Sequence, residues 1–127
     1  MAKENICLDT SILIDYYRKK NKSKAKLVEL SKKYEFSISV ITKFEILNGT
    51  SKDQNQFWNT FFTKVTIIPL DNNEIEIASN IYKNLKKENK LIDIPDILIA
   101  STAISQKSKL ATLNVKHFER IKGLKLA

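Results

Sequence analysis

Glycine, proline and cysteine are all scarce in this sequence. Only two glycines, two prolines and one cysteine occur among its 127 residues. With so few glycines and prolines there is no stretch of linker composition, and we therefore expect residues 1–127 to form one domain. The lone Cys7 excludes an internal disulfide and lies within a short apolar run, so we expect a buried thiol in a reducing compartment, the cytoplasm.

Several motifs that are typical of particular chemistries are absent. The sequence contains no glycine-rich phosphate loop, no cysteine and histidine spacing of a zinc site, and no serine hydrolase elbow. No apolar stretch approaches the length that crosses a bilayer, and the residues before Asp9 include too few apolar ones for a signal peptide. We therefore expect a cytoplasmic protein without membrane contact.

Positive charge, by contrast, is abundant. The formal net charge is +8 and the pI is about 9.5. Such a charge is typical of proteins that bind nucleic acid, although a lysine-rich composition that serves solubility explains it equally well. The densest basic stretch consists of Arg18, Lys19, Lys20, Lys22, Lys24 and Lys26. It is either a path for an RNA backbone or a solvated loop.

Short apolar runs alternate with helical patterns along the chain. Runs typical of strands occupy residues 6–8, 36–40, 65–68 and 110–112, with a weaker one at 124–126. The clearest helix opens with a capping box from Asp71 to Glu74, and apolar spacing predicts others at residues 25–34 and 57–62. This alternation predicts right-handed crossovers and a three-layer α/β/α domain around a short, mainly parallel sheet of four to five strands.

Three acids stand where apolar residues would be expected. Asp9 directly follows the first strand, and Glu45 lies four residues after Ile41 on an apolar helical face. Asp96 follows Pro95 in the first turn of an apolar helix. Acids at core-facing positions are costly unless they are paired or bind a cation. Because ligands in such folds bind beyond the carboxyl ends of the strands, we predict one metal site of oxygen ligands there.

Each acid also has a structural explanation. Asp9 could cap the following helix, although Thr10 or Ser11 could do so equally well and leave its carboxylate for a metal. Asp93 and Asp96 are three residues apart and could cap a helix start reciprocally. Asp93 is therefore either a cap or a part of the site.

Polar side chains also follow the fourth predicted strand. Thr112 and Asn114 offer neutral oxygens to a ligand, a water or a phosphate. His117 is the only histidine and lies beside Phe118, so it is either a substrate contact or a half-buried packing residue. We predict an outer layer of polar groups that orients water and phosphate, formed by Thr10, Ser11, Thr112 and Asn114.

Four short segments follow one another along the chain in a characteristic order and spacing. They are LDTS at residues 8–11, EILNG at 45–49, DILIA at 96–100 and TLNVKHF at 112–118. Each is weakly specific alone, but together they extend over essentially the whole chain. In this order they closely resemble the PIN-domain family, and most nearly its branch of VapC-type toxins.

The resemblance implies an endoribonuclease that depends on Mg²⁺ or Mn²⁺. It implies that Asp9, Glu45 and Asp96 are the shared catalytic acids and metal ligands, with Asp93 as an accessory ligand. Asp9 and Asp96 would anchor the ion, and Glu45 would bind it or help to deprotonate the attacking water. Many relatives carry a fourth acid where this chain has Asn114. We therefore expect one firmly held ion, with any second ion arriving with RNA phosphate.

The resemblance also implies partners. Toxins of this branch pair with a small antitoxin whose tail occupies the groove, and they commonly form homodimers. The candidates for RNA contact are Arg18, Lys19, Lys20, Lys22 and His117. The aromatic pattern at residues 57–62 is explained equally well by an interface and by core packing.

Other functions are compatible with the same architecture. A PIN-like domain could mature RNA or cleave DNA flaps, or serve as a non-catalytic module that binds RNA or protein, which Asn114 would favour. A phospho-acceptor receiver domain would require paired acids after the first strand and an acceptor aspartate after the third. Here Asp9 stands alone and Pro69 follows the third strand, which argues against a receiver.

Overall fold

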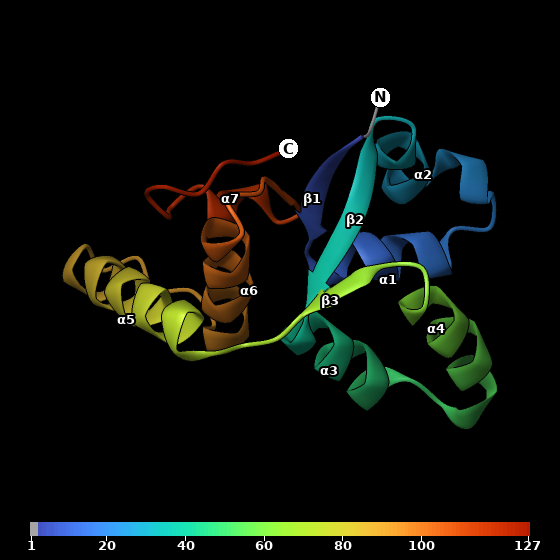
Figure 1. Cartoon of the computed structure of the whole chain (residues 1–127), viewed down its shortest axis with the longest axis horizontal. Coiled ribbons are helices and arrows are strands. Elements are labelled where there is room, and N and C mark those ends of the chain that lie inside the picture. The colour runs from blue at the N-terminus through green and yellow to red at the C-terminus, as the bar shows by residue number, and fades with distance from the viewer. Residues whose placement is uncertain (1–2) are drawn as a thin grey trace.

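The computed structural model of this chain describes residues 3–127 and contains a sheet of four strands. The strands are β1 (Glu4–Leu8), β2 (Tyr34–Ser39), β3 (Thr66–Ile68) and β4 (Leu110–Ala111). Their order in the sheet is β3-β2-β1-β4, and each neighbouring pair is parallel. The carboxyl ends of the strands therefore meet at one edge of the sheet (Figure 1). This arrangement confirms the predicted fold class.

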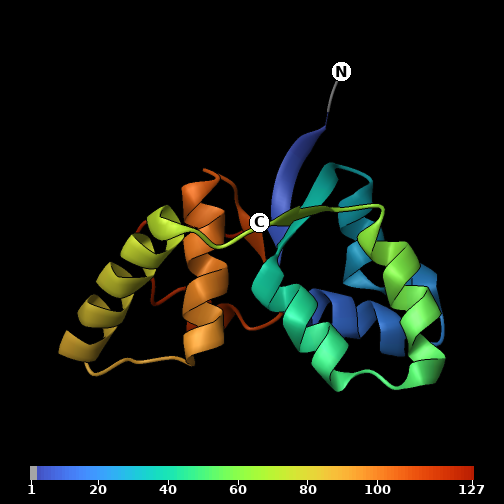
Figure 2. The same cartoon turned by 60° about the horizontal axis from the view of Figure 1, so that its bottom comes forward.

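Helices cover both faces of this sheet. Within the described residues they are α1 (Thr10–Arg18), α2 (Lys26–Ser31), α3 (Val40–Gly49), α4 (Asn55–Phe62), α5 (Asn72–Lys87), α6 (Ile94–Ser105) and α7 (Val115–Phe118), with two short 3₁₀ helices, η1 (Lys22–Lys24) and η2 (Lys52–Gln54). Figures 1 and 2 show α1, α2 and α4 on one side of the sheet, and α5 and α6 on the other. Among residues 3–127, every helix is too short or too polar to cross a membrane.

The last three residues of strand β1 are buried on both faces of the sheet. Ile6 and Leu8 pack in one hydrophobic cluster with residues of α1, α2 and α4, whereas Cys7 between them packs in a second cluster with residues of α5 and α6. Side chains alternate between the two faces of a strand, so a strand between two helical layers is apolar throughout. The predicted burial of Cys7 is confirmed, because its exposed fraction is 0%.

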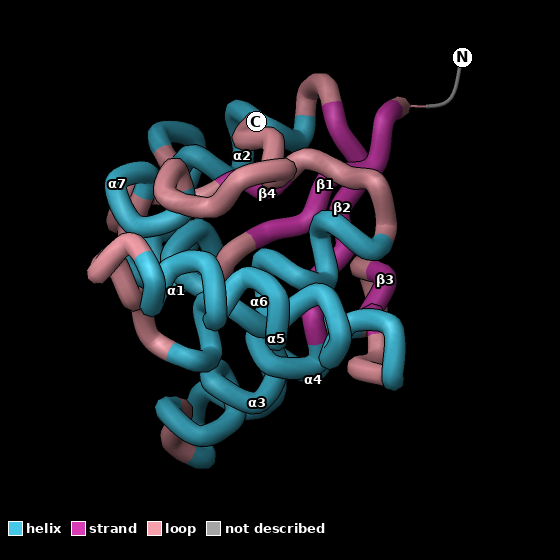
Figure 3. The backbone as a smooth tube through the Cα atoms, turned by 90° about the vertical axis from the view of Figure 1, so that its left-hand side faces the viewer, coloured by secondary structure: helices cyan, strands magenta, loops and turns pink. Residues whose placement is uncertain are grey.

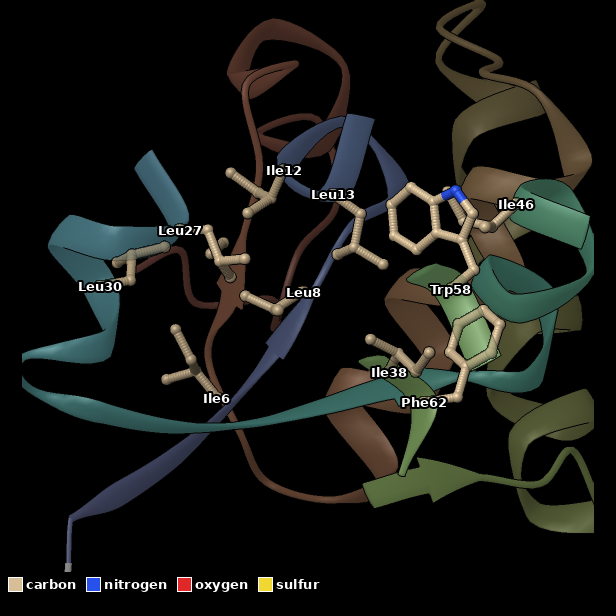
Figure 4. Close-up of a cluster of buried hydrophobic side chains, with 11 residues drawn as sticks. Ile6, Leu8, Ile12, Leu13, Leu27, Leu30, Ile38, Ile46, Trp58 and Phe62 are labelled. Atoms are coloured by element: carbon tan, nitrogen blue, oxygen red, sulfur yellow. The ribbon is translucent and has the colours of Figure 1, made fainter. Parts of the chain in front are cut away.

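The aromatic residues of α4 belong to the first of these clusters. Trp58 and Phe62 are buried, and Phe57 and Phe61 are half-buried against the same cluster (Figure 4). The ring centroid of Trp58 lies 5.0 Å from that of Phe57 and 6.2 Å from that of Phe62, distances typical of packed aromatic rings. Core packing therefore accounts for this aromatic pattern.

Helix α5 begins as its sequence predicts. The side chain of Asp71 accepts a hydrogen bond from the backbone N–H of Asn73, and the side chain of Glu74 accepts one from the N–H of Asp71. Both halves of the capping box are present. Two backbone N–H groups that the first helical turn cannot satisfy therefore find acceptors.

Two predicted boundaries around β2 are wrong. Tyr34, which the apolar spacing placed in a helix, begins β2, because α2 already ends at Ser31. Val40, which was predicted to end the strand, is the first residue of α3. The helix begins there because the hydroxyl of Ser39 accepts a hydrogen bond from the backbone N–H of Ile41 at 3.0 Å and so caps it.

The weak fifth run at residues 124–126 does not form a strand. It makes a single parallel bridge between Leu126 and Leu110, so the sheet has four strands in the described part of the chain. Figure 3 shows this final segment beside β4. It covers the outer edge of the sheet and leaves the edge at the carboxyl ends of the strands open.

Candidate active site

The predicted acids lie around the carboxyl ends of β1, β2 and β4. Asp9 directly follows β1, and Glu45 lies on α3, which starts where β2 ends. Asp93 occupies the N-cap position of α6, and Asp96 lies in the first turn of that helix, just after Pro95. The parallel sheet thus gathers acids that lie far apart in the sequence.

Asp9 is held firmly in place. Its side chain is only 2% exposed, and its Oδ2 atom accepts hydrogen bonds from the hydroxyls of Ser11 and Thr112, each at 2.8 Å. Asp9 occupies the N-cap position of α1, yet its side chain makes no capping hydrogen bond. The explanation of Asp9 as a helix cap is therefore wrong.

The two hydroxyls beside Asp9 have a fixed direction. The backbone N–H of Leu113 donates to Ser11 Oγ at 3.0 Å, and that of Asn114 donates to Thr112 Oγ1 at 2.9 Å. Because each hydroxyl oxygen already accepts a backbone proton, its own proton points to the carboxylate. The loop after β4 therefore orients Asp9 through Ser11 and Thr112.

The other carboxylate oxygen of Asp9 is open. Among residues 3–127, Oδ1 has no hydrogen-bond partner, whereas Oδ2 has two. Every buried polar side-chain atom in the same range does have a partner, so solvent must reach Oδ1. This oxygen is the one that Asp9 can offer to a ligand.

Glu45 is held from the opposite side. Its Oε1 atom accepts a hydrogen bond of 2.6 Å from the hydroxyl of Thr10, which also lies 3.2 Å from the hydroxyl of Thr42. Thr10 carries a single hydroxyl proton, and a carboxylate is the stronger acceptor, so Thr42 donates to Thr10 and Thr10 donates to Glu45. Glu45 is half-buried, as its place on the helical face predicted.

Sequence reasoning missed Thr42. This residue is fully buried and lies three positions before Glu45 on α3, so both side chains project from one face of the helix. A polar residue at that spacing from a predicted catalytic acid was the available signal.

Asp96 binds its proton more tightly than an ordinary aspartate does. Burial is the main reason that the pKa of Asp96 rises from 3.8 to about 6, and the charges of Asp9, Glu45 and Asp93 raise it further. The nearby His117 acts in the opposite direction. Asp9, Glu45, Asp93 and His117 are therefore the charged groups that act on Asp96. Helix α6 is also closely packed behind Asp96, since Ala100 and Ala103 are fully buried.

Within the described residues, no lysine or arginine forms an ion pair with this group of acids. Four ion pairs occur among residues 3–127, and none includes Asp9, Glu45, Asp93 or Asp96. Carboxylate oxygens without a protein cation fit a hard divalent ion such as Mg²⁺ in donor type and in charge. In the described chain, however, no three Asp, Glu, His or Cys side chains already converge as one set of metal ligands. The charge and the donor chemistry fit the ion, whereas a complete ligand set is not preformed.

The charge of Asp9 also affects the buried thiol of Cys7. Burial, with a smaller contribution from the charge of Asp9, raises the pKa of the Cys7 thiol to about 12. This thiol is therefore protonated and unreactive at neutral pH.

The remaining polar residues of the predicted site have different surroundings. Asn114 is exposed and enters the network through its backbone N–H, since its side chain has no hydrogen bond within the described range. His117 is exposed on α7, whereas its neighbour Phe118 is fully buried. The half-buried packing role considered for His117 is therefore wrong. Asp93 is exposed and makes no capping hydrogen bond with its side chain, which removes the reciprocal cap as its explanation.

The basic stretch after α1 is not uniform. Arg18 and Lys20 are exposed, and Lys19 forms an ion pair of 3.6 Å with Asp15. Lys22 differs, because its ammonium group donates hydrogen bonds of 2.6 Å to the carbonyl oxygens of two residues in the last turn of α1. Lys22 therefore stabilises a helix end, and Arg18, Lys19 and Lys20 are the exposed cations among the predicted lysine and arginine contacts to RNA.

The fold and this group of acids define the class of protein. The model of the family described as PIN domain matches residues 6–124, so the chain belongs to the PIN-domain family.

Two curated relatives are named ribonucleases. Ribonuclease VapC1 of Methanocaldococcus jannaschii is 42% identical over 127 residues, which cover 98% of this chain and 88% of that protein. Ribonuclease VapC1 of Rickettsia felis is 33% identical over 95% of this chain and 93% of its own length. The recognised likeness to VapC-type proteins is confirmed.

A solved structure is also similar over almost the full chain. It is the crystal structure of VapBC2 from Rickettsia felis bound to a DNA fragment from their promoter. The match has a TM-score of 0.80 and 26% sequence identity, and it covers 97% of both chains. The three-layer fold described above is therefore that of a solved VapBC component.

Proposed function

We propose that this chain is an endoribonuclease that depends on a divalent cation, and that it is the toxin of a VapBC-type toxin–antitoxin pair. The proposal rests mainly on one observation: the acids at the carboxyl ends of β1, β2 and β4 form no ion pair with a lysine or arginine among the described residues. The names of the relatives support the reaction, and VapBC structures support the assignment to a toxin–antitoxin pair.

Mg²⁺ or Mn²⁺ is the cation that suits these residues. Asp9 would hold it through the open Oδ1 atom, with Asp96 and Glu45 as further ligands and Asp93 as an accessory. When bound, such an ion makes a water nucleophilic and stabilises the leaving oxygen of a phosphodiester. The cation would also draw together carboxylates that repel one another in its absence.

The side chains of this site divide the remaining work. Ser11 and Thr112 fix the direction of Asp9, so this carboxylate does not need to reorient when substrate binds. Thr10 occupies Oε1 of Glu45 and leaves Oε2 for a water, where Glu45 would act as a base. The exposed Arg18, Lys19 and Lys20 would contact the RNA backbone, and the exposed His117, whose charge acts on Asp96, would contact substrate beside it.

An antitoxin segment would cover an apolar groove of the surface. This apolar groove of about 730 Å³ lies between α2 and α4 and includes Leu27, Phe57 and Phe61. None of the site acids lines it. A partner with apolar side chains at helical spacing would fill it, as expected for an obligate protein partner.

A second copy of the chain would cover another apolar surface. Phe44 on α3 is 64% exposed and Ile94 on α6 is 53% exposed, and Leu47 is exposed on the same helix as Phe44. Phe44 and Pro95 line one shallow pocket, so these parts of α3 and α6 are neighbours. Large exposed apolar side chains gathered in this way favour a homodimer through α3 and α6.

The first test is cleavage of total RNA and transfer RNA by the purified chain. Cleavage is expected with Mg²⁺ or Mn²⁺ and should disappear with EDTA, with Asp9→Asn and with Asp96→Asn. Asp71→Asn is the matched control, because it makes the same change at the cap of α5, where asparagine caps equally well. It should cleave as the wild type does.

Other outcomes favour the alternatives. A folded chain that binds RNA without cleaving it under any cation would be a non-catalytic module. Cleavage of branched DNA in place of RNA would indicate a flap nuclease. For the toxin assignment, expression should arrest growth, and co-expression of a neighbouring antitoxin gene should restore it.

A further inference from the structure

A pocket of about 340 Å³ adjoins the acid site and shares Glu45 with it. It lies between α1, α3, η2 and α4, and its other lining residues include Arg18, Gln54 and Trp58. The buried side chains of Ile46 and Trp58 give it an apolar wall. Its volume suits one small planar ligand rather than a folded segment.

Trp58 directs an unused hydrogen-bond donor into this pocket. The residue is 3% exposed, and its indole N–H has no acceptor among residues 3–127. Every buried polar side-chain atom in that range has a partner, so the N–H must lie at the surface. Figure 4 shows the nitrogen of Trp58 turned toward Ile46, which lines the same pocket. The N–H is therefore free to donate a hydrogen bond to a ligand that enters the pocket.

Gln54 provides a second donor beside it. Its Oε1 atom accepts a hydrogen bond from the backbone N–H of Ser51, as part of the capping box of η2. This contact fixes the orientation of the amide and leaves its NH₂ group without a partner in the described chain. Arg18 at the rim is a third donor, since its guanidinium forms no ion pair among these residues.

We propose that this pocket binds one unpaired nucleobase of the RNA substrate, beside the scissile phosphate, and that it prefers a base with carbonyl oxygens, uracil or guanine. The inference rests on the proposed function, because Glu45 connects the pocket to the acids. Single-stranded RNA is recognised through such splayed bases.

The preference follows from the donors. The N–H of Trp58 and the NH₂ of Gln54 complement carbonyl oxygens such as O4 of uracil or O6 of guanine. Adenine and cytosine present an amino group at the corresponding position, which would face donors and leave both sides unpaired. Arg18 would bind a phosphate of the same nucleotide, because a guanidinium matches phosphate oxygens.

One substitution replaces a hydrogen-bond donor of the pocket with an acceptor and keeps the contact that orients it. Gln54→Glu retains an oxygen for the N–H of Ser51 and replaces the free NH₂ donor with an acceptor. Gln56→Glu is the matched control, because it introduces the same charge at an exposed position of α4 that lines the other groove. Trp58→Phe removes the indole donor and retains an aromatic ring.

Binding can be followed directly, because Trp58 is the only tryptophan of the chain. The full-length Asp96→Asn protein, which should not cleave, would be titrated with hexauridylate, hexacytidylate and hexaadenylate while tryptophan emission is recorded. Hexauridylate should change the emission at a concentration about fivefold to tenfold lower than hexaadenylate, as expected for one or two hydrogen bonds. Gln54→Glu in this background should abolish or reverse the difference, and Gln56→Glu should retain it. Unchanged emission with every oligonucleotide, or equal affinity for all three, would overturn the proposal that this pocket binds a base.

Cleavage of a randomised single-stranded RNA pool provides the second test. The wild type should prefer uracil or guanine at one position beside the cut, and Gln54→Glu and Trp58→Phe should weaken the preference at that position alone. If Gln54→Glu cleaves with the same base preference as the wild type, the proposed base-binding role of the pocket is wrong and the proposed function remains intact. A folded wild type that cleaves no RNA would overturn the proposed function, while the fluorescence titration would still decide whether the pocket binds a base.

Discussion

The hydroxyl of Thr10 donates a hydrogen bond of 2.6 Å to Oε1 of Glu45, and this contact joins the start of α1 to the middle of α3. Thr10 is the residue after Asp9, whose carboxylate is oriented by Ser11. Two consecutive residues at the start of α1 therefore orient two different acids. A disturbance at this helix start should affect both.

Thr10→Val should reduce cleavage strongly, because valine keeps the shape of threonine and removes the hydroxyl that orients Glu45. Loss of such a supporting contact lowers activity about 10- to 100-fold. The free energy of unfolding should also fall by about 1–3 kcal/mol, because the buried hydroxyl of Thr42 loses its partner. Single-turnover cleavage and urea unfolding measure the two effects, and Thr10→Ser should restore both. Wild-type cleavage by Thr10→Val would remove Thr10 from the site.

Asp96 should make the folded chain less stable as the pH rises. Its pKa is 3.8 in the ordinary state and about 6 in the fold, so the folded chain binds this proton more tightly than the unfolded chain does. The favourable contribution is complete below pH 4 and is lost as the pH rises through 6. In metal-free buffer, Asp96→Asn should therefore exceed the wild type in unfolding free energy above pH 6 by about 1 kcal/mol, a value reduced for partial exposure.

The difference between Asp96→Asn and the wild type should shrink to nothing below pH 4. Urea unfolding across this pH range measures it, and Asp93→Asn serves as a control for the loss of an exposed acid. A difference that is independent of pH would mean that the charge of Asp96 is not its source.

Lys22 should matter for stability rather than for RNA binding. Its ammonium group donates to the carbonyl oxygens of Tyr16 and Tyr17 and lies 5.1 and 5.5 Å from the centroids of their rings. Lys22→Ala should lower the free energy of unfolding by about 1–2 kcal/mol, as expected when charge-assisted hydrogen bonds at a helix end are lost. The exposed Lys20→Ala should change stability by less than about 0.5 kcal/mol and weaken RNA binding instead.

The exposed side chains of α3 should control the oligomeric state. The double variant Phe44→Ser and Leu47→Ser should shift the chain from dimer to monomer in light scattering, without loss of thermal stability, because both residues are exposed. Ile75→Ser removes a similarly exposed apolar side chain from α5 and should leave the dimer intact. A wild type that is monomeric at micromolar concentration would rule out this interface.

The positions of Asp9 and Asp96 in the fold were predictable because each lies at a boundary that local patterns reveal. Asp9 follows an apolar run, and Asp96 follows Pro95 at a helix start, so topology alone brings them to one edge of the sheet. The capping box of α5 was predictable for the same reason, since both of its partners lie within one turn.

The supporting contacts were not predictable, because they join distant parts of the chain. Thr42 interrupts an apolar helix in the sequence, and only the packing of α1 against α3 shows that its hydroxyl supports Thr10. In the sequence Lys22 is indistinguishable from its basic neighbours. Only the structure shows that η1 brings its ammonium group back to the end of α1. Tyr34 was misassigned because its apolar spacing suits either a helix or a strand, and its position depends on pairing with β1.

The hydrogen bond from Thr112 to Asp9 spans 103 positions of the sequence and has a consequence for biosynthesis. A chain that grows by about 5–20 residues per second incorporates Asp9 roughly 5–20 s before Thr112 is added. During that interval neither β4 nor the loop after it exists, so a nascent chain carries the first acid without the groups that aim it. An interrupted translation product would be harmless to the RNA around it, and activity would begin only when synthesis is nearly finished.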